Sequence, residues 1–135
     1  MTARARGRFD VKLAALPMAD DKADATLARM SIDKRFEGDL DATGKGEMLS
    51  AVSGVQGSAG YVAIERVTGT LHGRRGAFTL QHTGAMTRGA PRLTITVVPD
   101  SGTDELVGLA GTMSITIVGK EHSYDLEYTL DPTPV

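Results

Sequence analysis

The chain reads Phe78-Thr79-Leu80-Gln81-His82-Thr83-Gly84-Ala85-Met86 past its middle. The large apolar side chains of this stretch all fall on every second position, and the positions between them are mostly polar. In an extended strand, Phe78, Leu80, His82 and Met86 would fall on one face and the residues between them on the other. Such alternation is typical of a β-strand with one buried face, whereas an amphipathic helix repeats its apolar residues about every 3.6 positions. This segment therefore predicts a strand.

Similar strand patterns recur from one end of the chain to the other. We expect strands over residues 9–14, 30–36, 40–49, 61–70, 77–86, 93–98, 112–118 and 123–130, with a short extra piece at 106–109. The segments 17–25, 53–60, 73–76 and 88–91 are expected to be loops or turns. No stretch with a helical period extends beyond one turn. About eight short strands at this spacing predict an all-β domain.

Glycines inside or directly beside the expected strands favour a closed barrel over a two-sheet sandwich. Interior glycines mark bends and bulges where strands coil around a closed surface, and closure removes exposed strand edges. The residues concerned are Gly38, Gly44, Gly46, Gly69, Gly84 and Gly111. The fold class expected is an all-β, closed antiparallel barrel of about eight strands, with a sandwich as the alternative. The domain is expected to span 1–135, with an ordered core at about 9–130.

The composition argues against several classes of function. The chain of 135 residues has no cysteine, no tryptophan and a net charge of −2. We therefore expect no thiolate chemistry, no nucleic-acid partner and no cofactor. The basic run around Arg4, Arg6 and Arg8 lacks a following apolar segment, so we expect it not to be a signal peptide and to fray. No segment is long and apolar enough for a membrane helix, and a cytoplasmic location is expected.

Tyr61-Val62-Ala63-Ile64-Glu65-Arg66-Val67 is apolar on both faces, apart from one acid and one base. If Glu65 faces inward, it is a buried carboxyl near Tyr61 with a raised pKa, suited to general acid or base chemistry. If Arg66 faces inward, it could pair with an anionic ligand near the rim. The structural alternative is an ion-pair ladder between strands. The sequence leaves the three possibilities open.

His82 is expected on the same face as Phe78, Leu80 and Met86. If this face lines the barrel, burial would keep the imidazole neutral, able both to donate and to accept a hydrogen bond. The structural interpretation, which we favour, is a core histidine bonded to a neighbouring carboxylate or carbonyl. The functional alternative is a histidine that faces a ligand, with the three apolar residues as the ligand-binding wall.

Other charged residues are interpreted as structural. Lys34 interrupts the apolar face of Met30, Ile32 and Phe36, and a β-bulge near Asp33 would explain it. Asp39, Asp41 and Glu47 are expected to form a solvated strand face rather than a calcium site. The spacing of His72, His82 and His122 fits no zinc site, so no metal is expected.

Val97-Val98-Pro99-Asp100-Ser101-Gly102-Thr103 is similar to the signature of aspartic peptidases, although Pro99 departs from its apolar lead-in. That chemistry requires two carboxylates that share a proton, so Asp100 would have to meet its copy across a dimer. The favoured interpretation is a turn between two strands.

Five stretches together resemble a bacterial family of uncharacterised small proteins with an allene-oxide-cyclase-like barrel. They are Met30–Lys34, Gly46–Leu49, Gly60–Arg66, Leu80–His82 and Val97–Thr103. The resemblance covers roughly 9–130 and implies an eight-stranded antiparallel barrel that often assembles as a homo-oligomer. Relatives of the wider fold include cofactor-free cyclases that shape a flexible apolar substrate. No cyclase catalytic residue maps onto a position of this sequence.

Three functions follow as hypotheses. The first is binding of a small apolar molecule inside the barrel, with Phe78, Leu80 and Met86 as apolar contacts and His82 with Glu65 or Arg66 as polar anchors. The second is a cofactor-free cyclase or isomerase that moves a proton with Glu65, His82 or Tyr61. The third is a dimeric acid peptidase around Asp100. The first is favoured.

Overall fold

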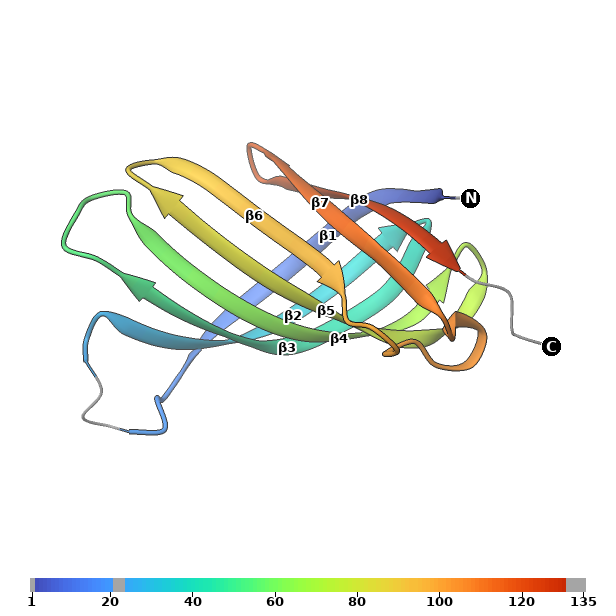
Figure 1. The fold of residues 1–135 in the computed structure, drawn as a ribbon, viewed down its shortest axis with the longest axis horizontal. Coiled ribbons are helices and arrows are strands. Elements are labelled where there is room, and N and C mark those ends of the chain that lie inside the picture. Colours follow the sequence, from blue (N-terminus) through green and yellow to red (C-terminus); the bar gives the residue numbers. More distant parts are fainter. Residues whose placement is uncertain (1, 21–23, 131–135) are drawn as a thin grey trace.

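The computed structural model of the chain describes residues 2–20 and 24–130. Within them it holds eight strands and one short 3-10 helix (Figure 1). The strands are β1 (Ala3–Leu16), β2 (Leu27–Gly38), β3 (Leu40–Val52), β4 (Ala59–Leu71), β5 (Arg74–Thr87), β6 (Ala90–Val97), β7 (Leu109–Val118) and β8 (Glu121–Leu130). The helix η1 (Asp104–Leu106) lies between β6 and β7. No helix of the described residues is long and apolar enough to cross a membrane.

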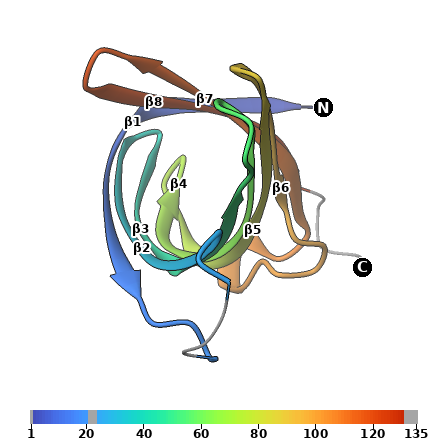
Figure 2. The same cartoon turned by 90° about the vertical axis from the view of Figure 1, so that its left-hand side faces the viewer.

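The strands close into a barrel in their order along the chain. Each strand pairs antiparallel with the next, and β1 pairs with β8, from Ala3 opposite Tyr128 to Phe9 opposite His122. Figure 2 shows the strands as a ring around a central axis. The predicted all-β, closed antiparallel barrel of eight strands is confirmed. Closure leaves alternate side chains of every strand pointing into the barrel.

One end of the barrel is filled by a hydrophobic core, and we call it the packed end. Phe36, Leu71, Phe78 and Leu126 are almost completely buried there. Leu106 of η1 belongs to the same cluster, so the helix covers this end. These side chains alternate with less buried neighbours along their strands, which is the pattern that the sequence predicted.

The opposite end, which we call the open end, is less completely closed. In the described part of the chain, β6 and β7 share two register pairs, Ile95 with Met113 and Thr96 with Thr112, while every other seam holds at least seven. Beyond these pairs the two strands diverge, and β8 stops pairing with β1 after Phe9. Met86, Leu93 and Ile117 are each more than two-fifths exposed at this end.

The loops differ from the expectation in small ways. The turn expected at 73–76 is shorter, because β5 begins at Arg74 and the turn is formed by His72 and Gly73. The piece expected at 106–109 contains the end of η1 and the start of β7. Of the loop expected at 17–25, residues 21–23 lie outside the described residues.

Candidate functional site

Glu65 points into the barrel and Arg66 points out of it. On β4 the buried positions are Ala63, Glu65 and Val67, with Tyr61 next in the same row. Glu65 is fully buried, whereas Arg66 is exposed and donates hydrogen bonds to Thr79 Oγ1 and to the carbonyl of Ser101. The ion-pair ladder between strands is therefore wrong for this pair, and so is an inward Arg66, since the pleat places these neighbours on opposite faces.

Lys34 also faces the interior, and this corrects the predicted bulge. β2 keeps a continuous register with β1 and β3 through Asp33 and Lys34, so an inward position follows from the pleat alone. The residue is only 6% exposed. Its Nζ lies 2.9 Å from Glu65 Oε1 and 5.0 Å from the ring centroid of Phe9. The lysine is thus held by a carboxylate and an aromatic face.

His82 completes a buried cluster with Lys34 and Glu65. Its Nε2 lies 2.7 Å from Glu65 Oε1, and the side chain is almost fully buried. Because an ionised carboxylate can only accept, the imidazole donates this hydrogen bond. Among the described residues these three are the buried polar or charged side chains, and they come from β2, β4 and β5. The core histidine bonded to a carboxylate is confirmed. We call these three residues the buried cluster.

The pKa of Glu65 is lowered, not raised as its burial alone predicted. Burial does raise the pKa of this carboxyl, but the hydrogen bond from His82 and the charge and hydrogen bond of Lys34 together lower it by more. Glu65 is therefore an ionised carboxylate at neutral pH. Since the charge of Lys34 is opposite, the ion pair within the cluster has no net charge.

One oxygen of Glu65 is left without a partner. Both hydrogen bonds go to Oε1, while Oε2 is buried and has no hydrogen-bond partner among the described residues. A Cβ built on Gly44 would lie 2.7 Å from Oε2, so the absence of a side chain there makes room for the carboxylate. An unpaired buried carboxylate oxygen is costly, so such atoms are few in native protein cores.

Tyr61 lies one inward position nearer the open end than Ala63. The ring is partly buried, with its centroid 6.4 Å from that of His82. Burial raises the pKa of the Tyr61 phenol, and the negative charge of Glu65 raises it further. The hydroxyl therefore stays protonated near neutral pH, able to donate or accept a hydrogen bond.

An apolar pocket of about 420 Å³ opens at the open end, next to Tyr61. We call it the mouth pocket. Its apolar walls come from four strands and from β7 across the short seam, and include Met48, Val52, Tyr61, Met86, Leu93 and Ile117. This volume lies within the usual range of sites for small molecules.

The predicted ligand-binding residues divide between the two ends. Met86 lines the mouth pocket, while Phe78 and Leu80 are buried in the core of the packed end. Met86 is 43% exposed although it shares a face with them, because the strands diverge at the open end. Sequence reasoning missed Leu93 and Ile117, whose inward alternation on β6 and β7 was the available signal. It also missed Lys34, whose place in the inward row of β2 was visible but was attributed to a bulge.

Asp100 lies in a turn, which is the interpretation that the sequence favoured over a peptidase signature. It is exposed, has a φ of 62° and follows Pro99, and the amide of Ser101 donates to the carbonyl of Val98 across the turn. No group of three or more histidine or acidic residues in the described chain is placed to hold a metal ion.

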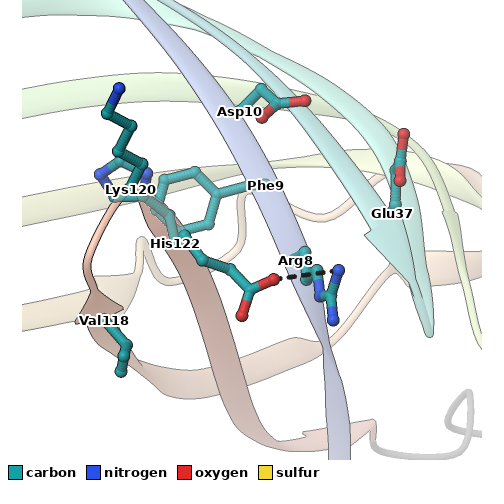
Figure 3. Close-up of a pocket in the computed structure, with 8 residues that line it drawn as sticks. Arg8, Phe9, Asp10, Glu37, Val118, Lys120 and His122 are labelled. Carbon is teal, nitrogen blue, oxygen red and sulfur yellow. Dashed lines mark ion pairs between the residues drawn. The ribbon is translucent and has the colours of Figure 1, made fainter.

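A second, polar cleft of about 560 Å³ lies on the outside, where β8 leaves β1 (Figure 3). Arg8 and Glu121 form an ion pair of 3.0 Å at its side. The rings of Phe9 and His122 pack at 5.2 Å behind it. Because its charges are exposed and of both signs, we expect this cleft to bind ligands less selectively than the apolar mouth pocket.

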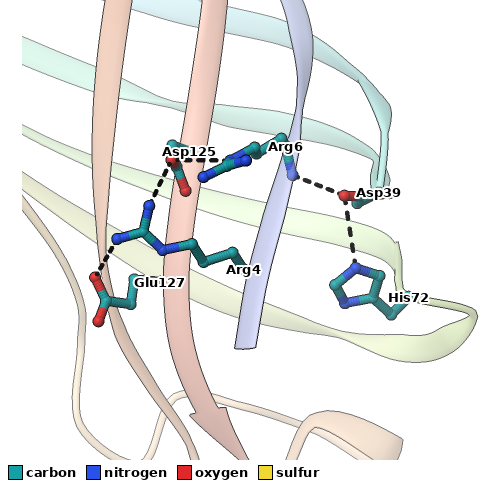
Figure 4. Close-up of polar contacts among 6 residues, drawn as sticks. All are labelled: Arg4, Arg6, Asp39, His72, Asp125 and Glu127. Atoms are coloured by element: carbon teal, nitrogen blue, oxygen red, sulfur yellow. Dashed lines mark hydrogen bonds and ion pairs between the residues drawn. The ribbon is translucent and has the colours of Figure 1, made fainter. Parts of the chain in front are cut away.

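The basic N-terminal run is held in the sheet, contrary to the expected fraying. Arg4 pairs with Asp125 and Glu127 on β8, and Arg6 pairs with Asp125 (Figure 4). The backbone amide of Arg6 also donates a hydrogen bond to the carboxylate of Asp39. The same carboxylate lies 3.6 Å from Nε2 of His72. The paired part of the chain therefore begins at Ala3 rather than near residue 9, because β8 supplies both backbone partners and acids.

Asp41 and Glu47 do lie on the solvent side of β3, where they pair with Arg35 and Arg29 respectively. The predicted solvated strand face is confirmed for these residues.

Comparison with known proteins agrees with this architecture. Residues 5–128 match the family model described as protein of unknown function (DUF3224). The chain is also similar to the crystal structure, at 1.84 Å resolution, of a DUF3224 protein of unknown function from Shewanella oneidensis MR-1. That likeness has 47% sequence identity and a TM-score of 0.92, and covers 98% of this chain and 100% of the other. No curated protein matches. The predicted bacterial family is confirmed, and the chain belongs to the DUF3224 family.

Proposed function

We propose that this protein binds a small, apolar, uncharged molecule in the mouth pocket. The observation that carries the proposal is an apolar pocket at one end of a closed barrel, backed by a buried Lys34–Glu65–His82 cluster. A barrel of eight strands either fills its interior with side chains or holds one small ligand. Side chains fill the interior at the packed end, whereas the open end has space for a small ligand.

The charges of the site favour an uncharged ligand. Lys34 and Glu65 neutralise each other deep in the barrel, so the interior offers no free charge to an ionised head group. A charged group in an apolar pocket would lose its hydration without a compensating partner. Arg92 is the charged residue among the pocket's described lining, and it lies exposed at the rim. A ligand with a hydroxyl or carbonyl group suits these walls better than a carboxylate.

The buried cluster is also an argument for function rather than stability. Replacing a buried ion pair by apolar residues of similar volume is often neutral or stabilising, so a barrel core does not need one. Perturbed titratable groups beside a pocket are enriched at functional sites.

Binding can be tested with decanol as the probe, by calorimetry and by the shift in melting temperature. We expect wild-type protein to bind decanol and to be stabilised by it, because the probe binds only the folded state. Ile117→Asp places a charge in the pocket wall and is expected to abolish both effects. Val107→Asp is the matched control, because Val107 is similarly exposed but follows η1 at the packed end. No binding by the wild type, or equal loss in both variants, would contradict the proposal.

Catalysis without a cofactor is a second candidate, since one observation favours it. His82 and Glu65 form an oriented acid–base pair at 2.7 Å, with the carboxylate fixing the imidazole. Such a pair could remove a proton from a bound molecule and return it elsewhere, as a cyclase or isomerase requires. If a molecule that copurifies with the protein is converted, Glu65→Gln and His82→Gln should abolish turnover while the fold survives. Binding without conversion would contradict catalysis and support the binding proposal only.

The predicted homo-oligomer remains a prediction, and the outer face of β3 and β4 is the surface that we propose for it. Leu49, Val62 and Ile64 are each about half exposed there, beside the Arg29–Glu47 ion pair. Sedimentation of the wild type and of Ile64→Asp would test this, because a charge in that face should shift an oligomer to monomers.

A further inference from the structure

On β4 and β5 the innermost residues that line the mouth pocket are Tyr61 and Gly84. These two residues are register partners, and both line the pocket. The next inward layer toward the packed end pairs Ala63 with His82, and neither residue lines this pocket. The buried cluster therefore begins directly behind Tyr61 and Gly84.

The ring of Tyr61 fills the space that a side chain at position 84 would take. A Cβ built on Gly84 would lie 2.3 Å from Tyr61 Cε1 and 2.8 Å from Cδ1. The ring therefore lies over the backbone of the partner strand. A ring over a cross-strand glycine stabilises the strand pair, but here it also lies across the way from the pocket to His82.

We propose that Tyr61 is the wall that separates the mouth pocket from the buried cluster and so determines how long a ligand the pocket accepts. This inference rests on the proposed binding function and adds a specificity residue to it. The wall is a side chain rather than backbone, so its size, and not its hydroxyl, sets the depth. The ligand class is an elongated apolar molecule whose inner end meets the phenol. Proton transfer by His82 would require the ring to turn aside.

The depth gained without the ring follows from strand geometry. One inward layer corresponds to two residues along a strand, or roughly 7 Å at about 3.4 Å per residue. Removal of the ring should therefore extend the pocket to Ala63 and His82 and accommodate a longer ligand.

The wall can be tested without any ligand, through the reactivity of His82. Diethyl pyrocarbonate acylates unprotonated imidazoles, and peptide mass spectrometry follows each histidine separately. His82 is almost fully buried, whereas the side chain of His72 is 38% exposed and serves as the internal reference. In Tyr61→Val we expect the rate at His82 relative to His72 to rise about tenfold, because access no longer requires local opening. Tyr61→Phe, which keeps the ring, should behave like wild type.

Two further variants keep this experiment decisive. Tyr61→Ala replaces the ring if the valine variant folds poorly, and Thr68→Ala is the control on the outer face of the same strand. Circular dichroism identifies any variant that has lost its fold. If His82 remains as protected in a folded Tyr61→Val or Tyr61→Ala protein as in the wild type, the inference is wrong.

A ligand series gives the second readout. The ratio of affinities for hexadecanol over decanol should rise about tenfold in Tyr61→Val, the effect of about two newly buried methylenes, and stay constant in Tyr61→Phe. An unchanged ratio in Tyr61→Val would overturn the role in specificity. If no variant binds either alcohol, the proposed binding function fails, while the protection of His82 still decides whether Tyr61 is a wall.

Discussion

The two ends of this barrel are built from the same strands but have opposite characters. At the packed end, Phe36, Leu71 and Phe78 are buried and η1 covers them. At the open end, Met86 and Ile117 occupy equivalent inward positions but remain exposed around a pocket. The comparison shows that an inward row of a barrel strand can form a packed core in one half and line a pocket in the other. The buried cluster lies at the boundary between these halves.

The largest effect that tests this division is the removal of an apolar side chain from each end. Phe36→Ala should lower the free energy of unfolding by about 3–5 kcal/mol, because it leaves a cavity in the core. Met86→Ala should cost less than about 1 kcal/mol, since the side chain is already 43% exposed. Urea unfolding of both variants measures the difference. Similar losses would mean that the open end is as tightly packed as the other.

The next effect concerns the boundary. Lys34→Met leaves the Glu65 carboxylate buried without its cation and should cost about 3–5 kcal/mol. The double variant Lys34→Met/Glu65→Gln removes both charges and should recover most of that loss. Chemical denaturation of Lys34→Met, Glu65→Gln and the double variant gives the coupling energy between the two side chains. A double variant no more stable than Lys34→Met would show that the pair is not held together by its charges.

The pH dependence of stability sharpens the same point. The folded-state pKa of Glu65 lies below its ordinary value of 4.5, so the folded protein favours the ionised form. The stability that this provides is fully present above pH 4.5 and is lost as the pH falls toward the folded-state pKa. Denaturation between neutral and acid pH should therefore show a component in the wild type that Glu65→Gln lacks. Parallel pH profiles would contradict it.

The smallest effect compares one tyrosine hydroxyl at each end. The hydroxyl of Tyr124 accepts from the amide of Leu40 and donates to the carbonyl of Glu37, tying the β2–β3 turn to β8. Tyr124→Phe should cost about 1–2 kcal/mol, because the buried amide loses its partner. Tyr61→Phe should change stability by no more than about 0.5 kcal/mol, since that hydroxyl makes no hydrogen bond within the described residues. Thermal denaturation of the pair is sufficient, and equal costs would contradict the contrast.

Period-two alternation was enough to predict the fold class, because each strand has one face toward the core. It also placed His82 correctly, in the same row as Phe78 and Leu80. It could not decide between Glu65 and Arg66, because β4 carries apolar residues on both faces: Val62 and Ile64 point outward yet are as apolar as the inward ones. Which face of β4 points into the barrel depends on its pairing with β3 and β5, and a local sequence pattern does not contain that information.

The site was less predictable than the fold, because it depends on residues far apart in sequence. Lys34 makes sense inside the barrel only once Glu65 and His82 are known to face it from β4 and β5. For the same reason the pKa of Glu65 was predicted in the wrong direction, since its cation was assigned to a bulge. The exposure of Met86 follows from the short β6–β7 seam, a property of strand lengths rather than of side-chain character.

The pairing of β1 with β8 makes the strand order circular. Ala3 lies opposite Tyr128, so the two ends of the described barrel are neighbours, and every strand touches those that precede and follow it. No strand is first in the geometric sense. A chain rearranged to start within the exposed loop between β3 and β4, with its former ends joined by a linker, would preserve all eight strand pairings. The same loop borders the open end, because Val52 and Ala59 at its two sides line the mouth pocket, so a domain inserted there would lie beside that pocket.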